Sequence, residues 1–300
     1  MLHEPVLTWY AENARDLPWR RRDRSPWGVF VSEIMAQQTP IARVLPAWQA
    51  WMQRWPTPSA LAADAPGEAI RAWGRLGYPR RALRLHQAAR VMVDRHAGAV
   101  PDCEESLRAL PGVGAYTAAA VAAFAFGRRT VVVDTNVRRL LARTVTGTEY
   151  PSTALTAAER ALAARLLPDD AGTAATWAVA AMELGALVCT ARAPRCTGCP
   201  VRPRCRLVAV GAPAHTGPRH AHTGPTRRAQ AYAGTDRYVR GLLLAALRAT
   251  QAPLSAADLT AGVPDAALRD PRQRERCLAG LVEDGLVEVA ESGYALPRAP

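Results

Sequence analysis

Four of the six cysteines fall within 17 residues, and this cluster constrains the fold more than any other feature of the sequence. The spacing is Cys189-x6-Cys196-x2-Cys199-x5-Cys205. Zinc ribbons and fingers usually present two close pairs, whereas four thiolates with one C-x-x-C pair and wider flanking gaps fit a [4Fe–4S] cluster. The spacing therefore predicts an iron–sulfur cluster, with a structural zinc held by the same thiolates as the alternative.

Positive charge accompanies the cluster. Five arginines lie between the cysteines or beside them: Arg192, Arg195, Arg202, Arg204 and Arg206. The whole chain has a net charge of +12, and all 38 of its cationic side chains are arginine. Such a charge favours a polyanionic partner such as nucleic acid, although a solvated arginine-rich surface would give the same number.

The sequence contains no membrane or secretion signal. No stretch approaches the roughly 20 uncharged apolar residues of a membrane span, and residues 1–5 lack the start of a secretory signal. We therefore expect a soluble, cytoplasmic protein, in which clustered cysteines indicate a metal site rather than disulfides. The isolated Cys103 and Cys277 are interpreted as ordinary buried small apolar residues.

Helical periodicity dominates from Trp27 to about Arg206, so the predicted fold class is all-α. Residues 131–133, three valines, form the only short β-branched run there. Residues 207–233 contain Ala-His-Thr-Gly-Pro twice, which predicts a flexible linker.

A smaller unit is predicted at 234–300. Its expected helices cover residues 238–249, 255–261 (with Ser255 as N-cap) and 272–284, followed by a hairpin of 286–289 and 294–296. Three helices and a hairpin are the order of a winged-helix module, which could equally contact DNA or serve as a packing element.

A glycine-rich turn connects two helical segments in the middle of the chain: Leu110-Pro111-Gly112-Val113-Gly114. Two glycines allow a tight turn whose backbone N–H groups, at a helix N-terminus, can receive a phosphate oxygen. Alone, such a turn is more often a simple helix connection.

Together, this turn, residues 134–139 (Asp-Thr-Asn-Val-Arg-Arg) and the cysteine loop resemble the helix-hairpin-helix superfamily of base-excision DNA glycosylases. The endonuclease III and MutY branches are the ones that carry the cluster. The similarity runs from about Leu17 to Cys205 and implies a glycosylase core over 1–206. This core would have a six-helix domain of about 25–130, and a cluster domain made of the N-terminal segment plus 131–206.

The chain has no lysine, which bears on the chemistry. Glycosylases that also cut the backbone form a Schiff base through a lysine amine. In the endonuclease III branch that lysine lies where this chain has Tyr116. The resemblance therefore implies a monofunctional enzyme that hydrolyses the glycosidic bond and stops.

Residues 32–39, Ser-Glu-Ile-Met-Ala-Gln-Gln-Thr, resemble the corresponding stretch of the adenine-removing MutY branch. Cleavage through an oxocarbenium-like state benefits from one protonated and one ionised carboxyl group. Glu33, on an apolar helix, is suited to a raised pKa and the general-acid role. Asp134, before a helix, is expected to remain ionised. Taken singly, Glu33 could be an ordinary surface glutamate and Asp134 an ordinary N-cap.

The resemblance also implies roles for other residues. Asn136 would support Asp134, and Tyr116 would lie near the reacting sugar. Gln38 would wedge into the base stack and Tyr78 would lie beside the damaged guanine. The remaining DNA contacts would come from Trp19 and Arg20, in the wall that receives the flipped base, and from Pro111, Gly112, Val113 and Gly114.

The chain departs from the MutY pattern at three places. Val179 replaces a Gln or Glu that reads the adenine edge, and Pro79 replaces the second tyrosine of Gly-Tyr-Tyr. Residues 234–300 are too few for the Nudix-like domain that checks for 8-oxoguanine. We therefore expect a weaker preference for 8-oxoguanine over guanine opposite adenine.

The expected substrate is double-stranded DNA with A:8-oxoguanine or A:G mispairs, bound by a monomer. A thymine or uracil mismatch glycosylase of the same fold is the closest alternative, and Glu33 favours adenine because a pyrimidine leaves without that acid. A non-catalytic DNA-binding or redox-sensing protein is the second alternative. The joint presence of Glu33, Tyr116, Asp134 and Asn136 argues against it.

Overall fold

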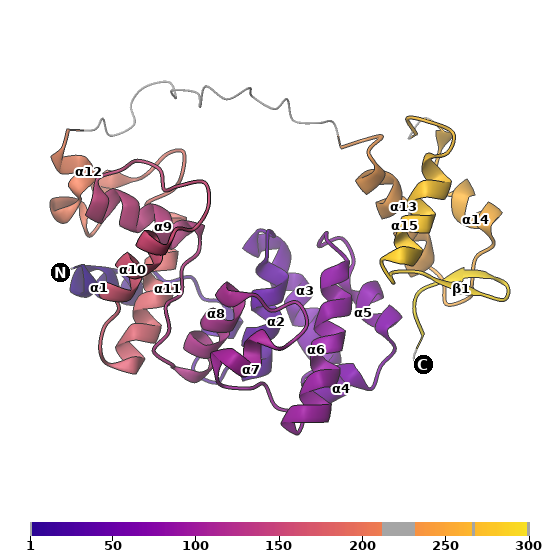
Figure 1. Ribbon diagram of the computed structural model, residues 1–300, viewed down its shortest axis with the longest axis horizontal. Helices are drawn as coiled ribbons and strands as arrows, with labels where there is room; N and C mark the ends of the chain where they lie inside the picture. The colour runs from indigo at the N-terminus through magenta and orange to yellow at the C-terminus, as the bar shows by residue number, and fades with distance from the viewer. Residues whose placement is uncertain (1, 212–231, 266–267, 299–300) are drawn as a thin grey trace. The chain divides into compact units, whose positions relative to one another are not determined.

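The computed structural model describes residues 2–211, 232–265 and 268–298, and the chain divides into two units (Figure 1). The first unit comprises residues 1–33 and 101–220, the second residues 34–100 and 221–300. Helices build both, with a single two-stranded sheet in the described ranges, so the all-α prediction is confirmed. Most of the predicted linker, 212–231, lies outside the described residues, and its first residues belong to a helix, α12.

The first unit surrounds a long helix. Its elements are α1 (His3–Asn13), η1 (Pro18–Arg20), most of α2 (Pro26–Ala36), α7 (Glu104–Arg108), α8 (Ala115–Phe126), α9 (Thr135–Leu141), the π-helical turn η2 (Ala142–Thr146), α10 (Ala157–Arg165), α11 (Ala171–Leu187), η3 (Cys196–Gly198), η4 (Arg202–Arg204) and α12 (Arg206–Ala209). Helices α1 and α9 pack against α11, where Val6, Leu140, Trp177 and Leu184 are buried together. This core fixes the helices that carry the candidate site.

Small residues let the helices of this unit approach closely. Helix α8 is buried from Thr117 to Ala123, and its alanines let it pack near α11. At Gly185 on α11, a Cβ atom would lie 2.7 Å from the Asn136 carbonyl oxygen. Only glycine therefore fits where α11 passes the start of α9. The valine run at 131–133 joins no strand, and its central Val132 is buried.

The second unit combines residues 34–100 with the C-terminal module. Its elements are the end of α2, α3 (Ile41–Arg54), α4 (Pro58–Ala62), α5 (Pro66–Trp73), α6 (Arg80–His96), α13 (Asp236–Arg248), α14 (Ala256–Ala261), α15 (Gln273–Glu283), β1 (Glu288–Ala290) and β2 (Gly293–Ala295). Trp51 and Trp73, both fully buried, meet edge to face, with ring centroids 5.8 Å apart. Helix α6 packs on α4 and α5 and buries Leu85 and Met92.

The C-terminal elements follow the predicted order, and each expected helix is present to within two residues at either end. Ser255 is the N-cap of α14, because its hydroxyl accepts a hydrogen bond from the Asp258 backbone N–H at 3.1 Å. Strands β1 and β2 pair antiparallel, and Leu254 forms an isolated bridge with Tyr294. The winged-helix interpretation of the module stays a prediction.

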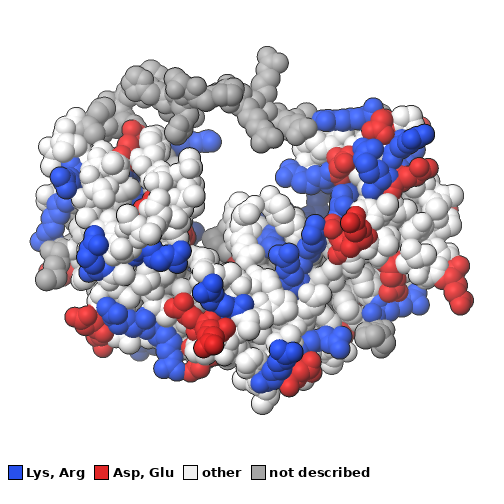
Figure 2. All heavy atoms as spheres, viewed as in Figure 1, with Lys and Arg blue, Asp and Glu red and all other residues white. Residues whose placement is uncertain are grey.

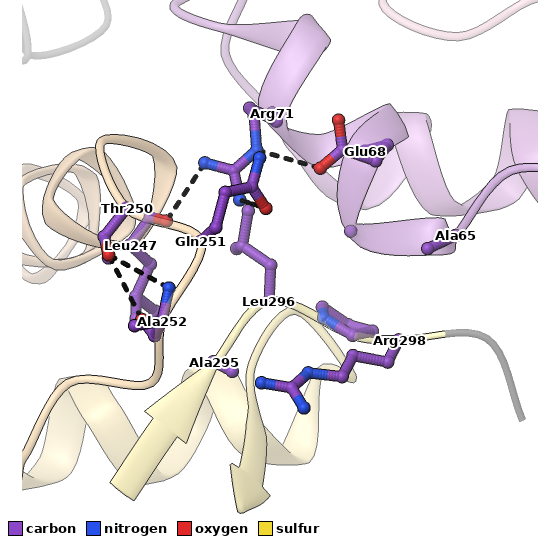
Figure 3. A pocket seen from close by; sticks show the side chains of 12 residues that line it. Ala65, Glu68, Arg71, Leu247, Thr250, Gln251, Ala252, Ala295, Leu296 and Arg298 are labelled. Atoms are coloured by element: carbon purple, nitrogen blue, oxygen red, sulfur yellow. Dashed lines mark hydrogen bonds and ion pairs between the residues drawn. The ribbon is translucent and has the colours of Figure 1, made fainter.

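Figure 3 shows the contacts between this module and α5. Arg71 forms an ion pair with Glu68 on its own helix, and its guanidinium donates to the Gln251 side chain at 3.2 Å. The Gly67 backbone N–H donates to the Pro297 carbonyl at 2.7 Å, and a Cβ atom at Gly67 would lie 2.5 Å from that oxygen. The module is therefore held on α5 through backbone contacts that require a glycine.

Opposite charges neutralise each other within the module. Residues 234–300 carry eight arginines and nine carboxylates, a net charge of −1, so residues 1–233 carry +13. Red and blue side chains lie next to one another over this part of the chain in Figure 2. Two of the ion pairs join Arg240 to Asp284 and Arg276 to Asp236. The excess positive charge of the protein therefore belongs to residues 1–233.

Among the described residues, no helix combines the length and apolar character needed to cross a membrane.

Candidate active site and cysteine loop

Glu33 lies on α2 among buried neighbours. Ser32, Ile34 and Met35 are each no more than 2% exposed, and Glu33 itself is half-buried. Burial raises the pKa of the Glu33 carboxyl from 4.5 to about 7, against the lowering effects of a hydrogen bond with Tyr116 and of the Arg20 charge. The nearby Asp134 raises it further. A carboxyl group with this pKa can hold a proton at neutral pH and give it up, as the sequence predicts for Glu33.

Tyr116 in the first turn of α8 connects the two carboxyl groups. Burial raises its pKa well above 10, and the charges of Glu33 and Asp134 raise it further. The hydroxyl therefore stays protonated. It donates to the Met182 sulfur at 3.7 Å and also hydrogen-bonds the Glu33 carboxyl group.

Asp134 is the N-cap of α9 and also belongs to this group. Its Oδ1 accepts from the Val137 backbone N–H at 2.7 Å, and its Oδ2 accepts from Asn136 Nδ2 at 2.6 Å. Burial raises the pKa of Asp134, although these hydrogen bonds oppose the rise. The structure thus brings Glu33, Tyr116, Asp134 and Asn136 together from α2, α8 and α9. The N-cap interpretation of Asp134 is confirmed, and its catalytic role stays a prediction.

A chain of hydrogen bonds runs from Asp134 to the cysteine loop. Asn136 Oδ1 accepts from Arg139 Nη2 at 2.7 Å. The same guanidinium donates to the carbonyls of Gly185 and Cys189, each at 2.7 Å. Arg139 is only 9% exposed. Its rigid fork therefore fixes Asn136 against both α11 and the first cysteine of the loop.

The four cysteines gather in space. Cys189 is buried and the other three are half-buried. Outside this loop Cys277 is buried as expected, whereas the expectation was wrong for Cys103, which is exposed. Burial raises the pKa of the Cys199 thiol to about 11, with further contributions from Cys189, Cys196 and Cys205. In the described ranges no three candidate ligands are arranged to hold a single metal ion. Cysteine thiolates are the ligands of a [4Fe–4S] cluster, so this four-cysteine donor set fits such a group.

Arg143 holds the loop from the side of η2. Its Nη1 donates to the Thr190 carbonyl at 2.7 Å and lies 3.5 Å from Cys189 Sγ. The Cys205 thiol donates to the Arg143 carbonyl at 3.6 Å. The five loop arginines are exposed, as expected for a surface that faces a polyanion.

Trp19 and Arg20 lie on η1, and Trp19 is buried. Arg20 Nη2 donates to Glu183 Oε2 at 2.9 Å, and Arg15 donates to the same carboxylate through Nε at 2.7 Å and Nη2 at 2.6 Å. Glu183 is fully buried, and hydrogen bonds from the two arginines hold its pKa near 2. Sequence reasoning missed this group: Glu183 is the single acidic residue of the alanine-rich helix α11, and nothing in the sequence indicates its partners. Val179 lies one turn earlier on α11 and is half-buried.

In the second unit, Gln38 and Tyr78 share an uncommon backbone conformation. Both have positive φ, 54° and 49°, both are exposed, and Pro79 follows Tyr78 as the N-cap of α6. Positive φ is rare for residues other than glycine and often marks functional sites. The structure thus presents both side chains at the surface of turns.

Arg81 fastens these two turns to each other. Its Nη1 donates to the carbonyls of Ile34 and Met35, at 3.1 and 3.0 Å, and also to that of Gln37. Its Nη2 donates to Thr39 Oγ1 and to the Gly77 carbonyl, each at 3.0 Å. The acceptors flank Gln38 on one side and Tyr78 on the other, so one buried guanidinium holds both turns. The sequence analysis did not identify Arg81.

The glycine-rich turn has the predicted form. Gly112 has φ 80°, and Gly114 is the N-cap of α8. Gly114 and Ala115 are exposed, and a Cβ atom at Gly114 would meet nothing within 4 Å. The start of α8 therefore lies at the surface, and Tyr116 follows directly on the same turn.

Comparisons with known proteins agree with this geometry. Residues 31–163 match the HhH-GPD superfamily of base excision DNA repair proteins. A solved thermostable thymine-DNA glycosylase is similar over 70% of this chain and 95% of its own, with a TM-score of 0.63 and 28% identity. An endonuclease III in a non-covalent DNA complex has the same fold, with a TM-score of 0.58, 21% identity, and coverage of 70% and 94%. The fold and site thus define a helix-hairpin-helix base-excision repair protein.

Two relatives show which family within this superfamily the chain belongs to. The adenine DNA glycosylase of Mycolicibacterium smegmatis is 50% identical over 293 residues, which cover 97% of this chain and 94% of the relative. The human adenine DNA glycosylase is 44% identical over 210 residues, 67% of this chain and 38% of the relative. The chain belongs to the adenine DNA glycosylase family.

Proposed function

We propose that the protein is a monofunctional glycosylase that hydrolyses the N-glycosidic bond of adenine mispaired with 8-oxoguanine or guanine in DNA. The observation that carries the proposal is the group formed by Glu33, Tyr116 and Asp134. It pairs a carboxyl group of pKa about 7 with a second carboxylate that is an N-cap. Such pairs of carboxyl groups in different environments perform glycoside hydrolysis.

In the proposed mechanism Glu33 gives its proton to a ring nitrogen of the everted adenine, which makes the base a better leaving group. The glycosidic electron pair leaves with the base, and Asp134 faces the developing positive charge at the sugar. Asn136 holds Asp134, and Tyr116 keeps Glu33 in place through its hydrogen bond. Water then adds to the sugar carbon and gives one proton to the ionised Glu33 carboxylate, which leaves an abasic site and restores the acid. The chain contains no lysine for a Schiff base, so the strand stays intact.

For DNA binding we propose that residues 1–233 supply the contacts, since they carry the excess positive charge. The amides at Gly114 and Ala115 would receive a phosphate, and the exposed loop arginines would lie on the backbone. Gln38 would enter the base stack, with Tyr78 beside the opposite base. Cys189, Cys196, Cys199 and Cys205 would hold a [4Fe–4S] cluster, which when bound would close and stiffen the loop.

Further proposals concern the assembly state, the location and a second candidate activity. The enzyme would act as a monomer in the cytoplasm, on nucleoid DNA. The fold similarity to a thymine-DNA glycosylase makes thymine release from T:G the second candidate activity.

A panel of duplexes tests the proposal. Single-turnover release is measured on A:8-oxoguanine, A:G and T:G duplexes, with and without alkali, on protein whose iron content is determined. We expect adenine release from the first two and strand cleavage only after alkali. Release of thymine alone would replace the proposal with the second candidate activity, and cleavage without alkali would contradict the monofunctional mechanism.

A further inference from the structure

Glu183 lies next to the candidate site, and the mechanism above does not use it. Its carboxylate is fully buried on α11 and accepts four hydrogen bonds. Three come from Arg15, including the backbone N–H at 3.1 Å, and one comes from Arg20 Nη2 at 2.9 Å. Because an isolated buried charge is costly, this carboxylate and its two arginines form a mutually dependent group.

Of these three residues, Arg20 is the one whose charge acts on the candidate catalytic groups. Its charge lowers the pKa of Glu33 and that of Tyr116. Its second amino group, Nη1, is buried and has no hydrogen-bond partner in the part of the chain that the structure describes. A buried donor without a partner costs about 1–3 kcal/mol, so such groups are usually satisfied by a ligand or water. A purine ring nitrogen is a suitable acceptor.

Two carboxyl groups therefore compete for Arg20. Glu183 ionises far more readily, because its pKa is held near 2, and it binds the guanidinium. Glu33 receives only the longer-range effect of the Arg20 charge and can remain protonated. If Glu183 did not hold it, Arg20 would have Glu33 as a nearby carboxylate partner, and an ion pair there would keep Glu33 ionised.

We propose that Glu183 is a positioning residue for adenine release, which holds Arg20 away from Glu33 and leaves one amino group of Arg20 free for the everted base. The proposal rests on the proposed glycosylase function. Glu33 is faced by Tyr116, Arg20 and Asp134. Glu183 is faced by Arg15 and Arg20. The charges of Glu183, Arg15 and Arg20 also act on the pKa of Tyr10 on α1.

The test is the pH dependence of single-turnover adenine release from an A:G duplex. In the wild type the rate falls as pH rises, because Glu33 loses its proton. In Glu183→Gln the freed Arg20 stabilises ionised Glu33, so this fall moves to lower pH by about one unit. Release above the midpoint is then about tenfold slower. A purely structural role would lower the rate at every pH without moving the midpoint.

A second set of variants tests whether Glu183 acts on the Glu33 pKa through Arg20. Arg20→Gln removes the charge that lowers the Glu33 pKa, so its midpoint moves to higher pH. The double variant Glu183→Gln/Arg20→Gln is expected to match Arg20→Gln, because Glu183 acts through Arg20. Arg21→Gln is the matched control, since Arg21 is an exposed neighbour that pairs with Asp16. Its midpoint is expected to equal that of the wild type.

Each outcome decides the proposal. The proposal is overturned if the Glu183→Gln midpoint equals that of the wild type. It is also overturned if the midpoint of the double variant lies at a lower pH than that of Arg20→Gln. Thermal unfolding checks that the variants fold. If Glu183→Gln does not, Glu183→Asp, which keeps the charge but draws it back from Arg20, must shift the midpoint in the same direction by a smaller amount. A wild type that releases no adenine would instead contradict the proposed function.

Discussion

Asp134 and Cys189 lie 55 positions apart in the sequence, yet only two side chains connect them. Asn136 Nδ2 donates to Asp134 at 2.6 Å, and its carbonyl oxygen accepts from Arg139 at 2.7 Å. Arg139 in turn donates to the Cys189 backbone carbonyl at 2.7 Å. The position of the candidate catalytic carboxylate is therefore tied to the loop that the cysteines close.

Arg139→Gln is predicted to break this connection, because glutamine cannot reach Asn136, Gly185 and Cys189 together. By analogy with residues that orient ligands from a second layer, we expect adenine release to slow about 10- to 100-fold. Single-turnover rates measure this effect. Arg138→Gln is the control on the same helix, since Arg138 pairs with Glu159. Equal slowing in both variants would show that helix α9 is merely weakened.

Two substitutions at Asp134 are predicted to separate catalysis from helix capping. Asparagine can still accept the Val137 N–H, although it loses the bond from Asn136, so Asp134→Asn should keep the cap and reduce adenine release by about 100-fold or more. Asp134→Ala should lose the cap as well, at a cost of about 1 kcal/mol. Urea unfolding and single-turnover rates measure the two effects. An active Asp134→Asn enzyme would remove Asp134 from the mechanism.

Glu33→Gln is predicted to stabilise the protein in a pH-dependent way. The carboxyl has a pKa of 4.5 in the unfolded chain and about 7 in the folded protein. Wild-type stability is therefore lost as pH rises from about 4.5 through 7, and glutamine avoids this loss. The advantage of the variant should grow over that range to about 2–3 kcal/mol and then level off. A difference independent of pH would contradict the raised pKa.

Arg81→Lys is predicted to loosen both turns that carry Gln38 and Tyr78. A single ammonium cannot reach acceptors on both turns, so stability should fall by about 2–4 kcal/mol and affinity for DNA should weaken. Denaturant unfolding and DNA titration of the folded variant measure these. Arg84→Lys, at an exposed position of the same helix, should change neither. Unchanged DNA affinity in Arg81→Lys would mean that Arg81 is not needed to hold the turns that carry Gln38 and Tyr78.

Local features of the sequence predicted much of the fold. Helix starts at Asp134 and Ser255 follow from their capping side chains, and the turn at Gly112 follows from its need for positive φ. Short-range signals of this kind act within a few residues. The Glu33, Tyr116 and Asp134 group could also be assembled, because each residue lies in a recognisable motif.

Interactions between distant residues were not predictable. Glu183 meets Arg15 across 168 positions, and neither residue stands in a pattern that suggests an ion pair. Arg81 reads as one more cation on an arginine-rich helix, and only the fold shows that it is buried beneath five acceptors. Positive φ at Gln38 and Tyr78 was likewise not predictable, because it is uncommon for residues other than glycine.

The most direct test of the central claim is the pH profile of adenine release by the wild-type enzyme under single-turnover conditions. If Glu33 is the acid, the rate should fall with rising pH, with a midpoint near the Glu33 pKa of about 7, and Glu33→Gln should abolish most of the release. A rate that stays constant through neutral pH, or a Glu33→Gln enzyme that retains the wild-type profile, would contradict the account.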